Sequence, residues 1–297
     1  MKLPAYLKPK DKIAIVCTAR AVEAHELQPA IELLEDWGLI PVYGNTIGLK
    51  HHQFGGTDDE RANDLQSAIN DPEINAIWIA RGGYGTARII DSVDFQALLN
   101  NPKWIIGYSD VTALHLHLQH LGLSSLHAQM PLDIDSKSQQ TIESLRQSLF
   151  EKPYELKFTS NFHSVSGECK GELIGGNLSV LFSVLQSIPV STFKGKILVL
   201  EDLDEYLYHV DRMMLNLYRS GLLHQIKGLI VGGMSDMNDN AIPFGQSAYE
   251  IIAAYAEKLN IPVAYDAPFG HIFDNLALTL GRKAKLKVSN NEISLTY

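Results

Sequence analysis

Cysteine is almost missing from this 297-residue sequence, which contains only Cys17 and Cys169. Cys17 closes an apolar run and Cys169 lies in a polar segment, so we expect two reduced thiols and no disulfide framework. The sequence also lacks any apolar run of the roughly 20 residues that a membrane-spanning helix requires. Its first eleven residues contain no continuous apolar segment of the signal-peptide type. These absences predict a cytoplasmic protein.

Basic residues are in the minority, because 25 Lys and Arg residues face 34 Asp and Glu residues and the net charge is −9. An acidic balance without basic clusters is unfavourable for binding nucleic acid or an anionic membrane, so we expect neither partner. The hydrophobic share of 45% is typical of a globular protein with a substantial core. The length allows two domains of ordinary size.

Motifs for dinucleotide and metal binding are missing as well. The turn Arg81–Gly85 contains glycines in the spacing of a dinucleotide fingerprint, but Arg88 takes the place of the third glycine. An arginine is too large for the close contact made there.

His115, His117 and His120 share a predicted helix, where their i, i+2 and i+5 spacing does not converge on one ligand. We therefore expect no metal site.

Apolar runs of strand character alternate regularly with helical spacing in the first half of the chain. The predicted strands are 12–17, 39–43, 75–80 and 103–108, and the clearest predicted helices are 24–37 and 57–70. This alternation predicts βαβ units and a mostly parallel sheet, so the fold class is α/β.

The regular alternation stops between residues 151 and 168, which we interpret as a connection between two domains. Further along, the pattern predicts strands at 196–201, 228–232 and 261–266 and helices at 177–188, 205–223 and 246–259. Residues 277–297 have the pattern of a β-ribbon with a turn at 289–292.

The stretch Trp104–Asp110 carries the clearest chemical signal. A short apolar run ends in Gly-Tyr-Ser-Asp and passes straight into a segment with helical apolar spacing. We expect this turn to lift the Ser109 hydroxyl to the carboxyl edge of the sheet, beside the free N–H groups of a helix start. The same logic underlies the nucleophile elbow of serine hydrolases, although Val111 replaces its second glycine. The alternative is that Ser109 is an ordinary N-cap.

A serine, a carboxylate and a histidine each follow an apolar strand, at the edge where α/β sheets bind ligands. In this hypothesis His271 takes the proton from Ser109, and Glu201 holds the imidazole. The alternatives are that Glu201 belongs to an acidic helix start and that His271 is a packed structural residue. Glycines 82–85 either supply an oxyanion site together with the N–H of Asp110 or cradle a phosphate.

These pieces, in this order, resemble the LD-carboxypeptidase family of serine peptidases, which includes muropeptide LD-carboxypeptidases and microcin-immunity peptidases. The matching segments are Ile13–Val16, Gly56–Ala62, Arg81–Gly85, Gly107–Asp110, Ile174–Asn177, Leu200–Asp202 and Pro268–His271. They extend over nearly the whole chain, which makes the set specific although each segment alone is weak. One departure is His127-Ala128-Gln129, where relatives often carry His-Gly followed by proline.

The resemblance implies that Ser109 is the nucleophile, Glu201 the orienting acid and His271 the base. It also implies that the backbone N–H groups of Gly83 and Asp110 form the oxyanion hole. Further predicted substrate contacts are those of Arg81, Gly82 and Asn177. Arg81 is the candidate partner of the substrate carboxylate, with a purely structural arginine as the alternative.

For the whole chain, the resemblance implies a Rossmann-like domain over residues 1–155 and a domain with barrel-like β elements over residues 168–297. It implies a homodimer that needs no metal or organic cofactor. The implied reaction is release of the terminal D-amino acid, D-Ala, from murein tetrapeptides during cell-wall recycling.

Three alternatives stand beside this expectation. The first is a self-immunity peptidase of the same family that cleaves a peptidyl-nucleotide antibiotic. The second, from another class, is a non-catalytic module that binds a sugar or nucleotide. A glutaminase-like amidotransferase is disfavoured, because it needs a cysteine where this chain has Ser109.

Overall fold

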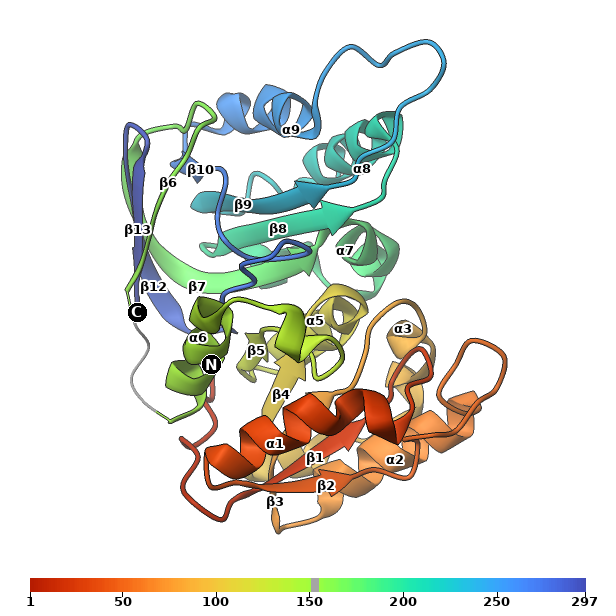
Figure 1. The fold of residues 1–297 in the computed structure, drawn as a ribbon. Helices are drawn as coiled ribbons and strands as arrows, with labels where there is room; N and C mark the ends of the chain where they lie inside the picture. The colour runs from red at the N-terminus through yellow and green to blue at the C-terminus, as the bar shows by residue number, and fades with distance from the viewer. Residues whose placement is uncertain (151–154) are drawn as a thin grey trace. The chain divides into compact units, whose positions relative to one another are not determined.

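The computed structural model describes residues 1–150 and 155–297, and the chain divides into two compact units (Figure 1). Unit 1 comprises Met1–Lys152 and Leu276–Thr279, and unit 2 comprises Pro153–Asn275 and Leu280–Tyr297. Each unit contains a sheet covered by helices, so the predicted α/β class is confirmed. None of the helices in the described ranges has the length and apolar character that crossing a bilayer demands.

Unit 1 is built on a six-stranded sheet with the order β11-β5-β4-β3-β1-β2. The pairs from β2 across to β5 are all parallel, as the strand–helix alternation predicted. The strands are β1 (Lys12–Val16), β2 (Ile40–Tyr43), β3 (Ile74–Ile79), β4 (Trp104–Gly107), β5 (Ser125–His127) and β11 (Leu278–Leu280).

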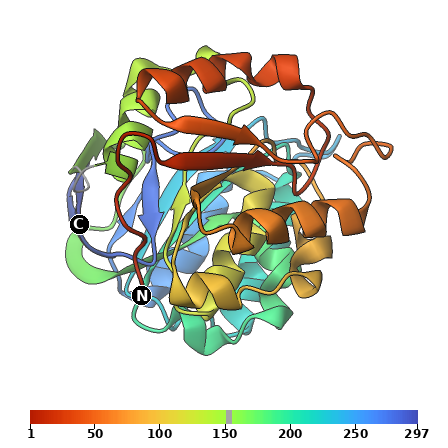
Figure 2. The same cartoon turned by 90° about the horizontal axis from the view of Figure 1, so that it is seen from below.

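Helices cover both faces of this sheet, as Figure 2 shows for α1 and α2 on either side of the β1–β2 pair. Successive strand side chains point to opposite faces. Ile13 and Ile15 therefore join one core with side chains of α1 and α6, whereas Ala14 and Val16 join the other with those of α2 and α5. Burial on both faces explains why the strands are continuously apolar. The helices are α1 (Gln28–Asp36), α2 (Asp58–Asn70), α3 (Thr86–Ile89), α4 (Gln96–Asn100), α5 (Thr112–His120) and α6 (Gln139–Phe150).

Unit 2 is built on a seven-stranded mixed sheet with the order β10-β9-β8-β7-β12-β13-β6. Strands β7 to β10 pair in parallel, whereas β7, β12, β13 and β6 pair antiparallel. The strands are β6 (Leu156–Thr159), β7 (Gly167–Asn177), β8 (Ile197–Leu203), β9 (Gly228–Ser235), β10 (Val263–Ala264), β12 (Lys283–Ser289) and β13 (Glu292–Thr296).

The edges of the unit 2 sheet are tied to each other by the segment that follows β6. Val165 forms an antiparallel bridge with Val263 of β10, the opposite edge strand. The Asp266 carboxylate accepts hydrogen bonds from the backbone N–H of Asn161 at 2.7 Å and of Phe162 at 3.3 Å. This connection gives the sheet the barrel-like character that was expected.

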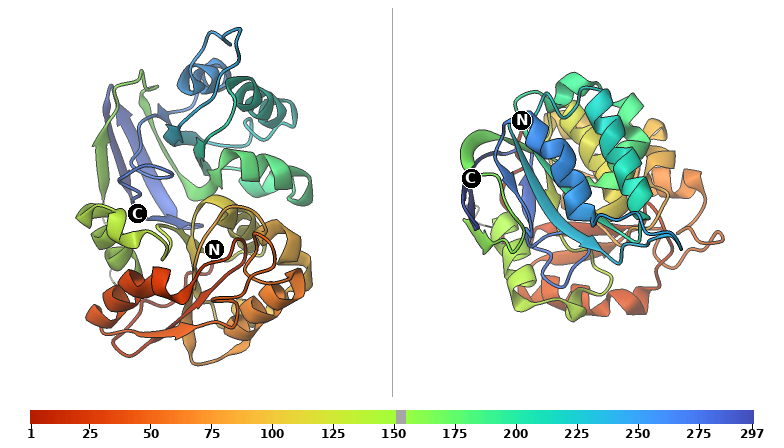
Figure 3. Two further views of the ribbon diagram at one scale, coloured as in Figure 1. Left: turned by 45° about the vertical axis from the view of Figure 1, so that its right-hand side comes forward. Right: turned by 90° about the horizontal axis from the view of Figure 1, so that it is seen from above.

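In the part of unit 2 that the structure describes, helix α8 packs against the α-helices α7 and α9 (Figure 3). These helices are α7 (Leu178–Val184), α8 (Leu207–Arg219) and α9 (Ala248–Ala256). Each lies inside one of the three predicted helical segments, which extended a few residues further at both ends.

Two predictions about irregular segments are wrong in part. The predicted connection over 151–168 lies partly outside the described residues, and its described part contains strand β6. The ribbon predicted over 277–297 begins only at Lys283, because β11 pairs instead with the unit 1 sheet. The remaining ribbon turns between Ser289 and Glu292 as predicted, with Asn290 at φ 54°.

Candidate active site

Ser109 stands on a sharp turn between β4 and α5. Its φ of 64° lies in the left-handed region, which a serine occupies at a cost and which is common at functional sites. Gly107 makes the turn possible, because a β-carbon there would lie 2.8 Å from Cγ2 of Val111. The N-cap position of the following helical turn belongs to Tyr108, so Ser109 is not the N-cap of that turn. A strained turn at a strand end is the geometry of a nucleophile elbow.

The glycine turn at the end of β3 lies beside the elbow. A β-carbon at Gly82 would lie 3.2 Å from Cβ and 3.3 Å from Oγ of Ser109. Gly83 follows with a φ of 108°. Within residues 1–150 and 155–297, no acceptor takes the backbone N–H of Gly83 or of Asp110. Two donors are therefore available next to the serine, as an oxyanion site requires.

A buried polar network fixes this glycine turn to the elbow. The Asp110 carboxylate accepts the backbone N–H of Thr86 at 2.8 Å. Burial raises the pKa of Asp110, while hydrogen bonds from Thr86 and the charge of Arg61 oppose the rise. Arg61 is fully buried and donates to the carbonyls of Gly85, at 3.0 Å, and of Thr18. These buried hydrogen bonds hold the glycine turn and the elbow in one arrangement.

His115 supports the strand that leads to Ser109. Its Nε2 lies 2.8 Å from the carbonyl oxygen of Gly107, and its Nδ1 lies 2.8 Å from Oγ of Ser125. A carbonyl only accepts, so Nε2 carries the proton and Nδ1 accepts from the serine. Burial lowers the pKa of His115 to about 3, which keeps the ring neutral. The carbonyl of Gly107 also accepts the N–H of Ala128 at 3.1 Å.

No group of three His, Cys, Asp or Glu side chains that could hold a metal occurs in the part of the chain that the structure describes. His115, His117 and His120 do lie together on α5. His115 is held by a carbonyl and a serine instead, and the ring of His117 packs 4.8 Å from that of Phe95.

Glu201 and His271 meet in unit 2. Glu201 lies within β8 and is fully buried, so it does not belong to the acidic start of a helix. Its Oε2 accepts from Nδ1 of His271 at 2.7 Å and from the backbone N–H of His271 at 3.2 Å. Because a carboxylate can only accept, Nδ1 carries a proton and Nε2 is left as the basic nitrogen of the neutral ring.

Local backbone features bring this pair together. The pairing of β8 with β9 shifts register between Leu200 and Asp202, and such a bulge re-aims the side chain it contains. Gly270 has a φ of 101°, and a β-carbon there would lie 2.6 Å from Cβ of Glu201. Only glycine fits this close approach. Oγ of Ser235 holds the carbonyl of His271 at 2.8 Å.

Asn177 lies next to this pair but has other contacts. It is buried; its Oδ1 accepts the N–H of Val180 at 3.1 Å, and its Nδ2 donates to Asp202 at 2.8 Å. The backbone N–H of Ser179 also binds Asp202, at 2.8 Å. Burial and the charge of Glu201 raise the pKa of Asp202 to about 7. Asn177 thus caps α7 and fixes Asp202, while its contact with substrate stays a prediction.

Two arginines lie beside the glycine turn, and the role of Arg81 as the partner of the substrate carboxylate stays a prediction. Nη1 of Arg81 donates to the carbonyl of Ala21 at 3.2 Å. The exposed side chain of Arg20, which the sequence analysis missed, lies against Gly83. A signal for it existed, since Arg20 follows Cys17 and Thr18 at the carboxyl end of β1.

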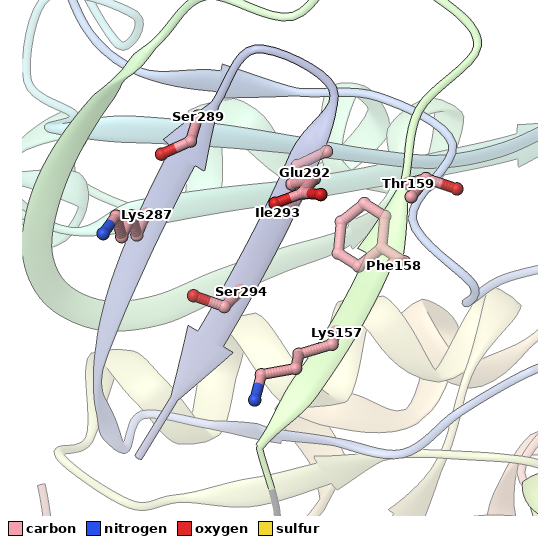
Figure 4. A pocket seen from close by; sticks show the side chains of 8 residues that line it. All are labelled: Lys157, Phe158, Thr159, Lys287, Ser289, Glu292, Ile293 and Ser294. Atoms are coloured by element: carbon pink, nitrogen blue, oxygen red, sulfur yellow. The ribbon is translucent and has the colours of Figure 1, made fainter.

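A pocket on the β6, β12 and β13 strands contains none of the predicted site residues (Figure 4). It lies on the antiparallel part of the sheet, and no residue of the turn at Ser109 or of the Glu201–His271 pair lines it. Its lining residues are Lys157, Phe158, Thr159, Lys287, Ser289, Glu292, Ile293 and Ser294.

Comparison with known proteins adds independent information. A family model described as the LD-carboxypeptidase N-terminal domain matches residues 13–128, and one described as the LD-carboxypeptidase C-terminal domain matches residues 170–286. A putative carboxypeptidase of Streptomyces coelicolor is 34% identical, over 98% of this chain and 95% of that protein. A probable murein peptide carboxypeptidase of Bacillus subtilis is 32% identical, over 96% and 92% of the two chains.

One solved structure and a further sequence relative agree with these matches. The crystal structure of a muramoyltetrapeptide carboxypeptidase from Oxalobacter formigenes has a TM-score of 0.86 and 28% identity, covering 96% of this chain and 97% of that one. The microcin C7 self-immunity protein MccF of Escherichia coli is 27% identical over 90% of this chain and 86% of its own length.

Proposed function

The chain belongs to the LD-carboxypeptidase family of serine carboxypeptidases, and on that premise we propose that it releases the terminal D-Ala from murein tetrapeptides. The names of two similar proteins, a murein peptide carboxypeptidase and a muramoyltetrapeptide carboxypeptidase, support this substrate class. The observation that carries the chemistry is the 2.7 Å hydrogen bond between Nδ1 of His271 and Glu201. It fixes the tautomer in which Nε2 can accept a proton.

In the proposed mechanism, Oγ of Ser109 attacks the carbonyl carbon that precedes the terminal D-amino acid, and Nε2 of His271 takes the serine proton. The backbone N–H groups of Gly83 and Asp110 bind the oxyanion of the tetrahedral intermediate. His271 then protonates the leaving amine, and Glu201 stabilises the imidazolium between the two steps. Water, activated by the same imidazole, releases the acyl group from Ser109.

The proposed reaction uses only side chains and backbone donors, so it needs no metal or organic cofactor. The family resemblance further implies a cytoplasmic homodimer that meets its peptide substrate during cell-wall recycling.

Substitution of Ser109 by alanine tests the proposal. We expect release of D-Ala from a murein tetrapeptide to fall by about 10⁴-fold or more, because loss of the nucleophile disables the whole triad. Amino-acid release is measured by chromatography, and circular dichroism checks the fold. Ser67→Ala on α2 is the matched control, since the Ser67 hydroxyl donates to the carbonyl of Asn63 within its own helix, at 2.8 Å. Turnover by Ser109→Ala at the wild-type rate would exclude the mechanism.

A second candidate is cleavage of a peptidyl-nucleotide, favoured by the similarity to MccF. Side-by-side turnover of a murein tetrapeptide and an aminoacyl-sulfamoyl adenylate separates the two substrates, and faster turnover of the adenylate would favour this candidate. A non-catalytic binding module is excluded if a serine-directed fluorophosphonate labels Ser109 and not Ser67.

A further inference from the structure

Arg20 is held against the glycine turn by its own backbone. A β-carbon at Gly83 would lie 2.6 Å from Cδ and 2.7 Å from Nε of Arg20. The main chain of Arg20 forms an antiparallel bridge with Phe54. The next residue, Ala21, donates its N–H to the carbonyl of Gln53 at 2.9 Å. The segment is therefore fixed, while the Arg20 side chain itself is exposed.

The side chain of Arg20 differs from those of the other four arginines among residues 1–150. No acidic side chain pairs with it anywhere in the described ranges 1–150 and 155–297. A guanidinium without an acidic partner presents a planar fork of donors that matches a carboxylate. The other four are engaged: Arg61 and Arg88 with Asp58, Arg146 with Glu143, and Arg81 with the carbonyl of Ala21.

A carboxypeptidase acts on a peptide whose terminal carboxylate lies close to the bond that is cleaved, and so close to Gly83 and Arg20. The terminal carboxyl carbon of the substrate is three bonds from the scissile carbonyl carbon, at most about 4.3 Å by the sum of ordinary bond lengths. The scissile oxygen is expected on the N–H of Gly83. A cation packed on Gly83 is therefore within reach of the terminal carboxylate.

We propose that Arg20 binds the terminal carboxylate of the substrate and so restricts the enzyme to the last residue of a peptide. This inference rests on the proposed function, because that function assigns Gly83 to the oxyanion. Arg81, the carboxylate partner predicted from the sequence, is instead a positioning residue: its bond to the carbonyl of Ala21 ties β3 to the segment that carries Arg20.

Two matched substrates test the proposal: a murein tetrapeptide with a free terminal carboxylate and the same peptide as its terminal amide. For Arg20→Ala we expect kcat/KM for the acid to fall about 10- to 100-fold, mostly through KM, with little change for the amide, since one charge-assisted bidentate pair is lost. Arg20→Lys should restore part of the preference. Arg146→Ala, which removes an arginine on α6, should leave the acid-to-amide ratio unchanged.

Binding of the acid and the amide can also be compared in a variant that does not turn the substrate over. Calorimetry of the acid and the amide with Ser109→Ala should show tighter binding of the acid, and Ser109→Ala/Arg20→Ala should bind both alike. An unchanged acid-to-amide ratio in Arg20→Ala, or an equal loss on both substrates, overturns the role of Arg20 while leaving the peptidase proposal intact. Persistent D-Ala release by Ser109→Ala would instead overturn the peptidase proposal, and the role of Arg20 with it.

Discussion

Unit 1 holds its candidate nucleophile through the main chain, whereas unit 2 holds its candidate base through a buried side chain. Ser109 is fixed by a left-handed turn, by the glycines around it and by the network of Asp110 and Arg61. His271 is fixed by the carboxylate of Glu201. A nucleophile needs position above all, and a base must be stabilised when it becomes charged. The two kinds of support match those two needs.

His115 and His271 differ in the group that holds the ring. A carbonyl holds His115 and a carboxylate holds His271, both by one ring nitrogen. A buried carbonyl has no charge with which to stabilise an imidazolium, so burial lowers the pKa of His115 to about 3. The carboxylate beside His271 supplies the charge that a proton acceptor needs. The partner of the ring, more than the ring itself, separates the structural histidine from the catalytic candidate.

The largest expected effect comes from removing the charge that supports His271. Glu201→Gln keeps the size of the side chain but not its charge, so we expect kcat for D-Ala release to fall by about 10⁴-fold with the fold retained. Steady-state kinetics measures the loss. Glu205→Gln is the control, because Glu205 and His209 form another carboxylate–histidine pair in unit 2, at 2.5 Å. Equal losses in both variants would mean that the Glu201 charge has no special role.

A smaller effect is expected from the glycine that admits Glu201. In Gly270→Ala the new β-carbon meets Cβ of Glu201 at 2.6 Å in a left-handed backbone. We expect the free energy of unfolding to fall by about 3 kcal/mol, from strain and overpacking together. Gly122→Ala in unit 1 also has a positive φ but meets nothing within 4 Å, so it should cost only about 1 kcal/mol. Urea unfolding measures the loss of unfolding free energy in both variants. Equal losses would contradict the steric argument.

The effect that is smallest near neutral pH is the pH dependence of stability caused by His115. Its pKa is about 3 in the folded protein against an ordinary value of 6.5, so the unfolded chain binds the extra proton between these values. Stability from His115 is thus fully present above pH 6.5 and is lost as the pH falls towards 3, by at most about 1.4 kcal/mol per pH unit.

The test of this pH effect is a comparison of His115→Gln with the wild type. The difference between their unfolding free energies, from urea titrations at several pH values, should shrink as the pH falls from 6.5. Activity at pH 8 should change far less than in Glu201→Gln, because the amide introduced by His115→Gln can still donate to the carbonyl of Gly107. A constant difference across this range would show that His115 is not kept neutral by burial.

Much of the fold could be predicted because its signals are local. Apolar runs predicted most of the parallel strands, although not β5 or β7, and the sequence Gly-Tyr-Ser-Asp at the end of β4 predicted the turn at Ser109, which adopts a φ of 64°. Strand β11 lies inside the ribbon predicted over 277–297, but no local signal indicates its pairing with β5, which is about 150 residues away in the sequence. Its place depends on long-range packing alone.

The candidate site also has features with a local sequence signal and features that depend on long-range contacts. Strand ends and the family resemblance indicated Glu201 and His271, but neither could reveal the bulge in β8 or the closeness of Gly270 to Glu201. Arg61 looks like a surface residue in an acidic helix start, yet it is fully buried, because it bonds carbonyls from distant turns as well as its neighbour Asp58. A local pattern does not contain the identity of such partners.

The return of the chain to unit 1 has a consequence for synthesis. Leu276–Thr279 belong to unit 1, and the N–H of Ala277 bonds Oγ of Ser144 at 2.9 Å. These residues leave the ribosome only after most of unit 2 has been made. The first sheet of the nascent protein therefore has an open edge beside β5 until most of unit 2 has been synthesised.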